Sequence, residues 1–444
     1  MLSDLIAARS QMAMSLGFHI VFAVLGIAMP VLMAAAEWRW LKTGDEVYLT
    51  LAKRWAKGTA ILFAVGAVSG TVLSFELGLL WPSFMEHAGP VVGPLFGLEG
   101  FAFFTEAIFL GIYLYGWSRI PPRTHFIAGL VVAVSGSASA IFIVTVNAWM
   151  NAPTGFDIID GQISNVRPLV PFLHPFAFHE TLHMLLAAFA ATGFLVAGIH
   201  AFLLLRHPTH RLHRNALAIA LVVGGIPALL QPISGDLIAR AVADHQPAKL
   251  AAMEALFVTE AGADFILFGL PDASTQTVDY AVVIPNGLSL LLHGDLHAVV
   301  PGLDRIPRHD WPPVAVTHVA FQVMVLCGLI MAGVTLWAGW RRWKGRVETD
   351  RWLLRILVVT APLGLVAIEA GWVVTEVGRQ PWTIQGLLRT SQAVTPMPGL
   401  WIPMVTFSVL YVVLAGVVVW AIRRHIAAAA TVPPVETETE RRAA

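Results

Sequence analysis

Nine long apolar stretches constrain this chain more than any other feature. A helix needs about 20 mostly apolar residues to cross a bilayer. The chain is also 57% hydrophobic and only 13% charged, which excludes an ordinary water-soluble protein. We therefore expect an all-α polytopic membrane protein with nine transmembrane helices in a single membrane domain, residues 1–425. The nine stretches are centred in roughly 12–36, 58–80, 95–117, 125–149, 175–205, 215–233, 313–340, 352–375 and 398–422.

The distribution of Lys and Arg predicts the orientation of these helices. About twice as many basic residues fall in one set of alternate loops as in the other, and cytoplasmic loops carry the excess of positive charge. We therefore expect the N-terminus outside and the C-terminus in the cytoplasm. The N-terminal residues MLSDLIAARSQ lack the basic segment of a cleaved signal, so we expect the first helix to be retained.

Two segments outside the expected helices differ in composition. The longest connection, 234–311, is expected outside the membrane, and a connection of that length is usually functional or disordered. The C-terminal stretch 426–444 is small, polar and contains proline, which is typical of a disordered cytoplasmic tail.

Charge and cysteine content exclude several classes of function. The 28 basic and 28 acidic residues balance, so no basic surface large enough to bind nucleic acid is expected. The single cysteine, Cys327, lies in an apolar stretch and excludes a disulfide framework and a cysteine-based metal site. Any cofactor must be held by His, Met, Asp or Glu.

Ionisable side chains inside membrane helices are costly, which makes them functional candidates. Most of those in this chain fall in the outer half of the expected membrane. They are His19, Glu76, Glu99, Glu106, His179, Glu180, His183, His318, Glu369 and Glu376.

His183 and Met324 are expected at similar depths in the fifth and seventh helices. An imidazole and a thioether on opposite faces form the axial pair of a low-spin, electron-transfer haem. For Met324 alone, the commoner role is filling core space. For His183 alone, a hydrogen-bonded core histidine is as good an interpretation as an iron ligand.

Residues 179–183, HETLH, also match the H-E-x-x-H motif. In that motif two His residues one helical turn apart bind zinc, and the Glu serves as a base. A membrane-embedded zinc metalloprotease is therefore an alternative, although the sequence shows no evident third ligand.

Glu99 and Glu106 are seven residues apart and so lie on one face of the third helix. A row of protonatable carboxyl groups is suited to carrying protons. The alternative is structural, with two neutral acids hydrogen-bonded to neighbouring helices.

The eighth helix ends in an unusual segment, GWVVTEVGRQPW at 371–382. The carboxylate of Glu376 is a possible iron ligand, and Arg379 can pair with a haem propionate. Trp372 and Trp382 can pack against macrocycles. The alternative is an aromatic belt at the membrane surface with a salt bridge.

With these motifs in place, the chain resembles subunit I of the cytochrome bd quinol oxidase family over nearly all nine helices. It looks like the short-loop, cyanide-insensitive type of that family. The matching segments, in order along the chain, are SQMAMSLGFH ending at His19, LEGFAFFTE at 98–106, VNAWMNAP at 146–153, KLAAME at 249–254, FQVMVLCG at 321–328 and GWVVTEVGRQPW at 371–382.

The resemblance implies a role for each matching residue. His183 and Met324 resemble the ligands of a low-spin haem b. His19 and Glu376 resemble the ligands of two high-spin haems, one haem b and one haem d or a third haem b in its place, in an order that the resemblance leaves open. The remaining residues fall into three groups: Glu99, Glu106, Ser139 and Asn147 on the proton path, Lys249 and Glu254 in the quinol-oxidising loop, and Trp372 and Arg379 beside the haems.

The implied activity is that of a terminal respiratory oxidase in the bacterial cytoplasmic (inner) membrane. Such an enzyme oxidises ubiquinol or menaquinol at the outer face, reduces O2 to water and takes protons from the cytoplasm, so that charge crosses the membrane. The resemblance also implies a second large membrane subunit as partner and leaves room for a small single-helix subunit.

This sequence departs from the family pattern at two positions. Gln322 stands where some members have Arg, and Ala107 stands where others have a hydroxyl-bearing residue. We expect haem potential and proton delivery to be sensitive to these two positions.

Two further functions stay open on the residues alone. A haem-b quinol dehydrogenase anchor needs the site at His183 and Met324 but not the one at His19 and Glu376. A proton-coupled transporter uses the row of carboxyl groups and binds no haem.

Overall fold

The computed structural model describes residues 3–430, which are mostly helical. Within that range nine helical spans are long and apolar enough to cross a membrane, as the sequence predicts. Their bounds are α1 Asp4–Thr43, α2 Glu46–Leu80, α3 Pro82–Tyr115, α4 Pro122–Asn151, α6 Pro175–Arg206, α7 Arg211–His245, α10 Val314–Trp343, α11 Arg351–Thr360 with α12 Leu363–Val377, and α14 Trp401–Ala430.

The helices differ from the expected stretches mainly at their ends. Helix α7 continues to His245, so the first part of the range 234–311 is helix and not loop. Helix α14 continues to Ala430, past the expected end of the membrane domain at 425, and the rest of the expected tail, 431–444, lies outside the described residues. Hydropathy detects the apolar part of a helix, whereas the hydrogen-bonded backbone continues into polar residues beyond it.

The eighth span is divided into two helices. Helix α11 ends at Thr360 and α12 begins at Leu363, with Pro362 between them. Proline has no N–H to donate and crowds the preceding turn, so a continuous helix is interrupted there.

Local sequence explains where several helices begin and end. Ser3 caps α1 and Asp45 caps α2, since their side-chain oxygens accept from Ile6 N and Val47 N at 3.3 and 3.0 Å. Gly44, with φ of 69°, makes the left-handed turn between these two helices.

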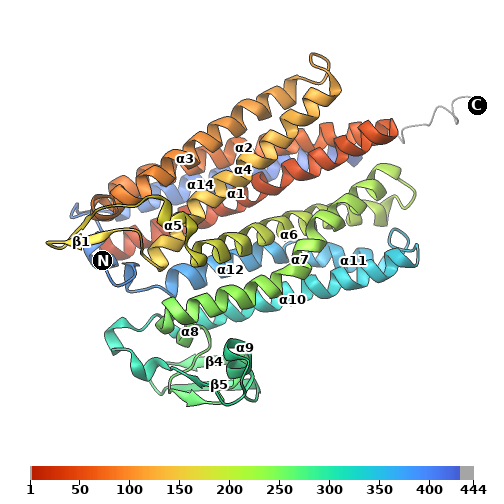
Figure 1. Cartoon of the computed structure of the whole chain (residues 1–444). Helices are drawn as coiled ribbons and strands as arrows, with labels where there is room; N and C mark the ends of the chain where they lie inside the picture. Colours follow the sequence, from red (N-terminus) through yellow and green to blue (C-terminus); the bar gives the residue numbers. More distant parts are fainter. Residues whose placement is uncertain (1–2, 431–444) are drawn as a thin grey trace, which may run out of the picture.

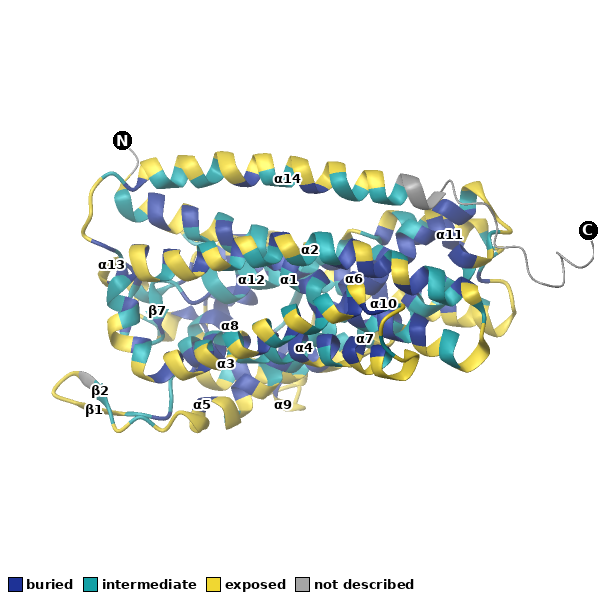
Figure 2. Ribbon diagram, turned by 90° about the horizontal axis from the view of Figure 1, so that it is seen from above, coloured by how far each residue is buried: buried dark blue, intermediate teal, exposed yellow. Residues whose placement is uncertain are grey.

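The spans form two groups that lie side by side in Figure 1. Helices α1 to α4 form one group, and α6, α7, α10, α11 and α12 form the other. Helix α14 packs on α1 and α2 at the edge of the bundle, where Figure 2 shows most of its surface exposed.

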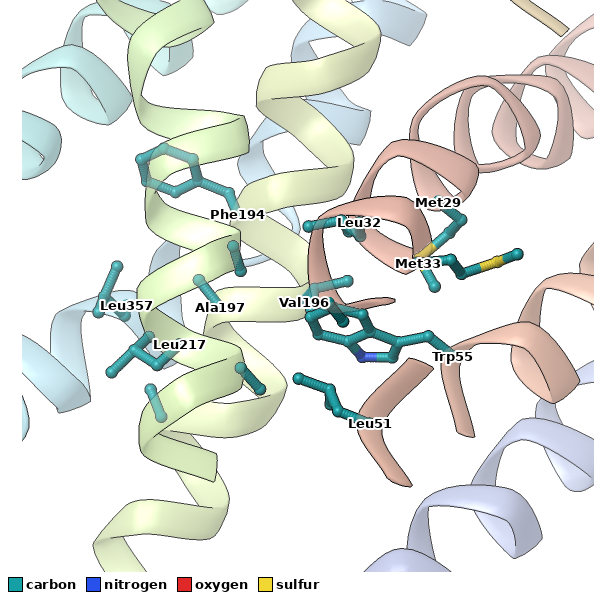
Figure 3. Packing of buried hydrophobic residues seen from close by; sticks show 14 of the residues in the cluster. Met29, Leu32, Met33, Leu51, Trp55, Phe194, Val196, Ala197, Leu217 and Leu357 are labelled. Atoms are coloured by element: carbon teal, nitrogen blue, oxygen red, sulfur yellow. The ribbon is translucent and has the colours of Figure 1, made fainter. Parts of the chain in front are cut away.

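A large apolar core joins the two groups. Figure 3 shows Leu32 and Trp55 from the first group beside Val196 from the second, in the same cluster as Phe194 and Leu217. Helices α6 and α7 approach so closely that a Cβ added to Gly193 would lie 2.3 Å from the Cα of Gly224. Small residues at such crossings allow backbones in a membrane to pack directly against each other.

The connections at the N-terminal end of the bundle carry short strands and helices (Figure 1). The strands pair in antiparallel order as β1–β2, β3–β6, β4–β5 and β7–β8. The bounds of these elements are β1 Asp157–Ile159, β2 Gln162–Ser164, α5 Leu169–Leu173, α8 Pro247–Met253, β3 Glu260–Ala261, β4 Phe265–Asp272, β5 Thr277–Ile284, α9 Gly287–His293, β6 Val299–Val300, 3-10 turns Leu303–Arg305 and Arg308–Asp310, β7 Trp382–Ile384, β8 Leu388–Arg389 and α13 Thr390–Ala393.

The long connection between α7 and α10 folds around its own apolar cluster. Leu250 and Met253 of α8 belong to this cluster with Leu288 of α9, and they pack with Phe176 of α6 and Val374 of α12. The connection is therefore anchored to the membrane helices beneath it.

Candidate functional site

A cavity of about 620 Å³ lies between α1, α2, α3, α4 and the end of α12. This volume is within the range of cofactor and small-molecule sites, roughly 300–1,000 Å³. Along α1 the lining extends from Arg9 to Ile27, which corresponds to about 27 Å of helix. The cavity therefore reaches from the N-terminal end into the middle of the bundle. The sequence-predicted site residues that line it are His19, Glu99, Glu106, Ser139, Asn147, Trp372, Glu376 and Arg379.

His19 is held in one tautomer by a neighbouring serine. Its Nδ1 lies 3.0 Å from Ser69 Oγ, and that hydroxyl donates to Val65 O at 2.9 Å. Because the hydroxyl proton is already used, Ser69 accepts from Nδ1–H, which leaves Nε2 of a neutral ring without a proton. An unprotonated Nε2 is what iron ligation requires, and ligating histidines usually donate their other N–H in this way.

His183 has the same arrangement in the second group of helices. Its Nδ1 lies 2.9 Å from Ser234 Oγ, which donates to the main-chain oxygen of Gln231 at 3.0 Å. The Gln231 side-chain amide lies 3.0 Å from Nε2 of His183. This amide donates to the bare nitrogen, so iron binding at Nε2 requires Gln231 to give up that hydrogen bond.

The structure holds His183 and Met324 against different neighbours. A Cβ added to Gly371 of α12 would lie 3.0 Å from the Met324 sulfur, whereas one added to Gly235 of α7 would lie 3.6 Å from the His183 ring. Neither His183 nor Met324 lines the large cavity. An axial pair at these two residues stays a prediction from the sequence.

Glu376 and Arg379 form an ion pair at the cavity wall, with Arg379 Nη2 2.6 Å from Glu376 Oε2. The other carboxylate oxygen of Glu376 accepts from the side chain of Asn147. Among the residues that the structure describes, Arg379 Nε and Nη1 and Trp372 Nε1 are buried without a hydrogen-bond partner. Three unsatisfied donors at one cavity suit an acidic ligand such as a haem propionate.

A chain of hydrogen bonds links Glu376 to Lys249 of α8. Lys249 Nζ donates to Asn151 Oδ1 at 2.7 Å, and Asn151 Nδ2 donates to Asn147 Oδ1 at 2.8 Å. Since Asn147 donates to Glu376, every donor in this chain is directed toward the carboxylate. The chain joins the outer connection to the cavity.

Lys249 and Glu254, the two predicted site residues of the outer connection, are both buried. Burial, followed by the nearby charge of Arg379, lowers the pKa of Lys249 to about 7. Burial raises the pKa of Glu254 to about 8. Glu254 lines a second cavity of about 240 Å³ beneath the β4–β5 hairpin. Both groups can therefore change protonation near neutral pH.

The carboxyl groups of α3 contact α4. Ser139 Oγ donates to Glu99 Oε1 at 3.4 Å. A Cβ added to Gly136 would lie 3.1 Å from the carboxyl of Glu106. The two acids face one neighbouring helix, as their seven-residue spacing predicts.

The structure adds no zinc ligand to the HETLH segment. Within residues 3–430, no group of three or more His, Cys, Asp or Glu side chains is arranged to hold a metal ion. Both ring nitrogens of His183 contact polar groups of α7, namely Ser234 and Gln231. The third ligand that the sequence lacked is therefore not supplied by the described fold.

Sequence reasoning missed several residues that support the site. Asn151 is four residues after Asn147, so helical spacing alone was a usable signal for it. Ser69, Ser234 and Gln231 carried no such signal, because their contacts with the histidines depend on how distant helices pack.

The comparisons with known proteins agree along nearly the whole chain. The family model described as cytochrome bd terminal oxidase subunit I matches residues 7–430. The Bacillus subtilis protein named "Putative cytochrome bd menaquinol oxidase subunit I" is 37% identical, over 96% of this chain and 98% of that one. Cytochrome bd ubiquinol oxidase subunit 1 of the same organism is 31% identical, over 96% and 94%. The solved structure of bd oxidase from Geobacillus thermodenitrificans superposes with a TM-score of 0.89 at 37% identity, covering 95% of this chain and 98% of that one.

Proposed function

This chain belongs to the cytochrome bd terminal oxidase subunit I family, and from that premise we propose how its residues oxidise quinol and reduce oxygen. As a member of this family, the chain is a multi-pass membrane subunit of a quinol:oxygen oxidoreductase that uses haem and works in a complex. The observation that carries the proposal is the large cavity. It brings a tautomer-fixed histidine, the Glu376–Arg379 pair and two carboxyl groups of α3 to one space.

The residues that line the large cavity fit a haem, and the ligand pair of the low-spin haem is carried over from the family resemblance. His183 and Met324 would hold a low-spin haem b, and His19 and Glu376 would hold two high-spin haems, one haem b and the other haem d or a third haem b. The unsatisfied donors of Arg379 and Trp372 would bind propionates. When bound, the haems supply the one-electron steps between quinol and oxygen.

Quinol oxidation is assigned to the outer connection. Glu254 lies buried in its own cavity and takes a proton from the quinol when its carboxyl group is ionised. Lys249 is linked to Glu376 through two asparagines and keeps the charge near the carboxylate balanced. Ubiquinol or menaquinol is the substrate, and its protons leave at the outer face.

Proton uptake is assigned to the carboxyl groups of α3. Glu106 lies deeper in the bundle than Glu99, which Ser139 orients from α4. Two quinols release four protons and four electrons, and one O2 needs four of each to form two waters. If the four protons come from the cytoplasmic side through Glu106 and Glu99, charge crosses the membrane at each turnover.

The orientation and the partners complete the proposal. The N-terminus lies outside and the C-terminus in the cytoplasm of a bacterial inner membrane, as the distribution of basic residues predicts. The partner is a second large membrane subunit, with a small single-helix subunit as an optional addition. The quinol dehydrogenase anchor has no use for a cavity that contains His19 and Glu376, and the zinc protease lacks a third ligand among the described residues.

A pair of histidine variants tests the assignment. The complete complex is purified, and reduced-minus-oxidised absorption spectra are recorded with and without carbon monoxide, alongside iron and zinc analysis. His183→Ala is expected to remove the low-spin haem b signal and quinol oxidase turnover, because an iron ligand is lost. His179→Ala, one turn away on α6, is expected to keep both.

Two outcomes would contradict the proposal. A colourless wild-type complex with stoichiometric zinc would favour the HETLH interpretation. A His183→Ala protein with an unchanged low-spin signal would remove this residue from the ligand set. A chlorin band in the red region of the spectrum would identify haem d.

A further inference from the structure

The row of polar side chains on α3 continues past Glu106 toward the far end of the bundle. Tyr113 follows Glu106 by seven residues, as Glu106 follows Glu99, so the three share one helix face at intervals of about 10.5 Å. Helix α4 matches this spacing in antiparallel order. A Cβ added to Gly136 would lie 3.1 Å from the Glu106 carboxyl, and one added to Gly129 would lie 2.7 Å from the Tyr113 ring.

Tyr113 belongs to a buried cluster with Glu37 of α1 and His125 of α4. Tyr113 and Glu37 are 0% exposed, and His125 is 2% exposed. His125 Nδ1 lies 2.8 Å from Glu37 Oε1, and Nε2 lies 2.8 Å from the main-chain oxygen of Tyr113. A carbonyl oxygen accepts only, so Nε2 carries a proton. One further proton is shared between Nδ1 and Glu37, and the pair has no net charge whichever partner holds it.

The cluster contains two groups that need a further partner. Within the described part of the chain, Glu37 Oε2 and the Tyr113 hydroxyl are buried, and neither makes a hydrogen bond of normal geometry. Glu37 is close enough to Tyr113 to act on it electrostatically. Buried polar groups are rarely left unpaired, and ordered water commonly fills this role. Water at these two atoms would extend the row of proton carriers beyond the pair.

The cluster also lies next to solvent. His125 is in the first turn of α4 and Tyr113 is in the last turn of α3. The ring of Trp117 covers His125 at a centroid distance of 3.9 Å, while Arg123 and Thr124 beside it are exposed. One indole ring therefore covers the imidazole at this end of the bundle.

We propose that Glu37, Tyr113 and His125 form the entry site for the protons that oxygen reduction consumes. This inference rests on the proposed function and extends its path from Glu106 to the surface at the α3–α4 connection. The cluster takes one proton from solvent while the pair already holds one, and it returns to its starting state when a proton moves on toward Glu106. Four such cycles supply one O2, and the electrons come from quinol.

The test removes single proton-carrying groups and leaves the packing in place. Tyr113→Phe keeps the ring and deletes only the hydroxyl, which makes no hydrogen bond of normal geometry within the described residues, so a role of Tyr113 in packing alone predicts no effect on proton uptake. Glu37→Gln keeps the shape of the side chain but cannot release a proton, and Glu37→Asp restores the acid. Tyr411→Phe on α14 is the matched control, since its hydroxyl is likewise buried without a hydrogen bond of normal geometry to a described residue.

The measurement uses the complete oxidase complex in lipid vesicles. Proton uptake from the side of the α3–α4 connection is followed with a pH-sensitive dye after the fully reduced enzyme is mixed with O2. We expect Glu37→Gln and Tyr113→Phe to slow uptake about tenfold or more, in keeping with the loss of a proton-transfer group. In both variants the haem spectrum and the anaerobic reduction by quinol are expected to match those of the wild type. Tyr411→Phe is expected to match the wild type in every measurement.

The possible results distinguish the entry site from the oxidase function on which it rests. Wild-type uptake from this side together with unchanged uptake in Tyr113→Phe overturns the entry site and leaves the oxidase function standing. A wild-type complex that reduces O2 without taking protons from this side overturns the proposed path and the entry site together. Proton uptake at the wild-type rate in Glu37→Asp, together with slow uptake in Glu37→Gln, supports the entry site.

Discussion

At the scale of single residues, burial determines the chemistry of the outer connection. Glu254 has a pKa raised to about 8 because its carboxyl group is buried, and within the described residues its Oε2 has no hydrogen-bond partner. The carboxyl group is therefore neutral at pH 7 and ionises as the pH rises through about 8. A proton acceptor must be ionised to act, so its activity increases in that direction.

The protonation of Glu254 predicts a pH dependence of quinol oxidation. We expect steady-state turnover to increase as the pH rises through about 8, since the ionised fraction of Glu254 grows. Glu254→Gln should lower turnover by about 10²- to 10⁴-fold, the usual contribution of a general base, and abolish this pH dependence. Glu260→Gln, an exposed carboxyl group at the same cavity, is the control and should keep the wild-type profile. The same pH profile in Glu254→Gln would show that another group accepts the proton.

At the scale of elements, the approach of two helices determines the geometry around His183. His183 is on α6, and its partners Ser234 and Gln231 are on α7. The two helices are held together at Gly193 and Gly224, where each backbone occupies the space that the other's Cβ would need. The tautomer of His183 therefore depends on a contact elsewhere along the same pair of helices.

A prediction at this scale is that Gly193→Ala destabilises the protein and weakens the low-spin site. The added methyl group meets the Gly224 backbone at 2.3 Å, so the helices must separate. Overpacking of this kind costs about 1–3 kcal/mol in the free energy of unfolding. Thermal unfolding of the purified complex and its low-spin haem content measure the two effects.

Gly333→Ala on α10 is the control for this substitution, since an added Cβ there meets no described atom within 4 Å. It should unfold at the wild-type temperature with full haem content. Equal stability of the two variants would mean that α6 and α7 have room to separate without cost.

At the scale of the whole molecule, the bundle has two chemically different ends. The strands and α8 lie at the end of the bundle where α1 begins (Figure 1). The lining of the large cavity also starts near that end, at Arg9 of α1. The Glu37–His125 pair lies toward the opposite end, near the α3–α4 connection. The proposed release of protons on one side and uptake from the other requires this polarity.

The corresponding prediction is the side of the membrane on which each end lies. In a Cys327→Ser background, Ser274→Cys in the β4–β5 turn should react with a membrane-impermeant maleimide. The reaction is carried out on cells whose outer envelope has been removed and whose cytoplasmic membrane is intact. Ser118→Cys, between α3 and α4, should react only after the membrane is opened. Both serines are exposed, so accessibility within the protein is matched. The reverse labelling pattern would invert the proposed orientation.

The number and order of the membrane spans could be predicted from the sequence, because hydropathy is a local property of about 20 residues. The sequence also placed Glu99 and Glu106 on one face, since helical periodicity is equally local. Which side chains meet follows from helix packing and could not be predicted: Ser69 contacts His19, and Glu37 contacts His125, although these residues lie far apart in the chain. Such pairings depend on the rotation and register of each helix against its neighbours, and no local pattern records either quantity.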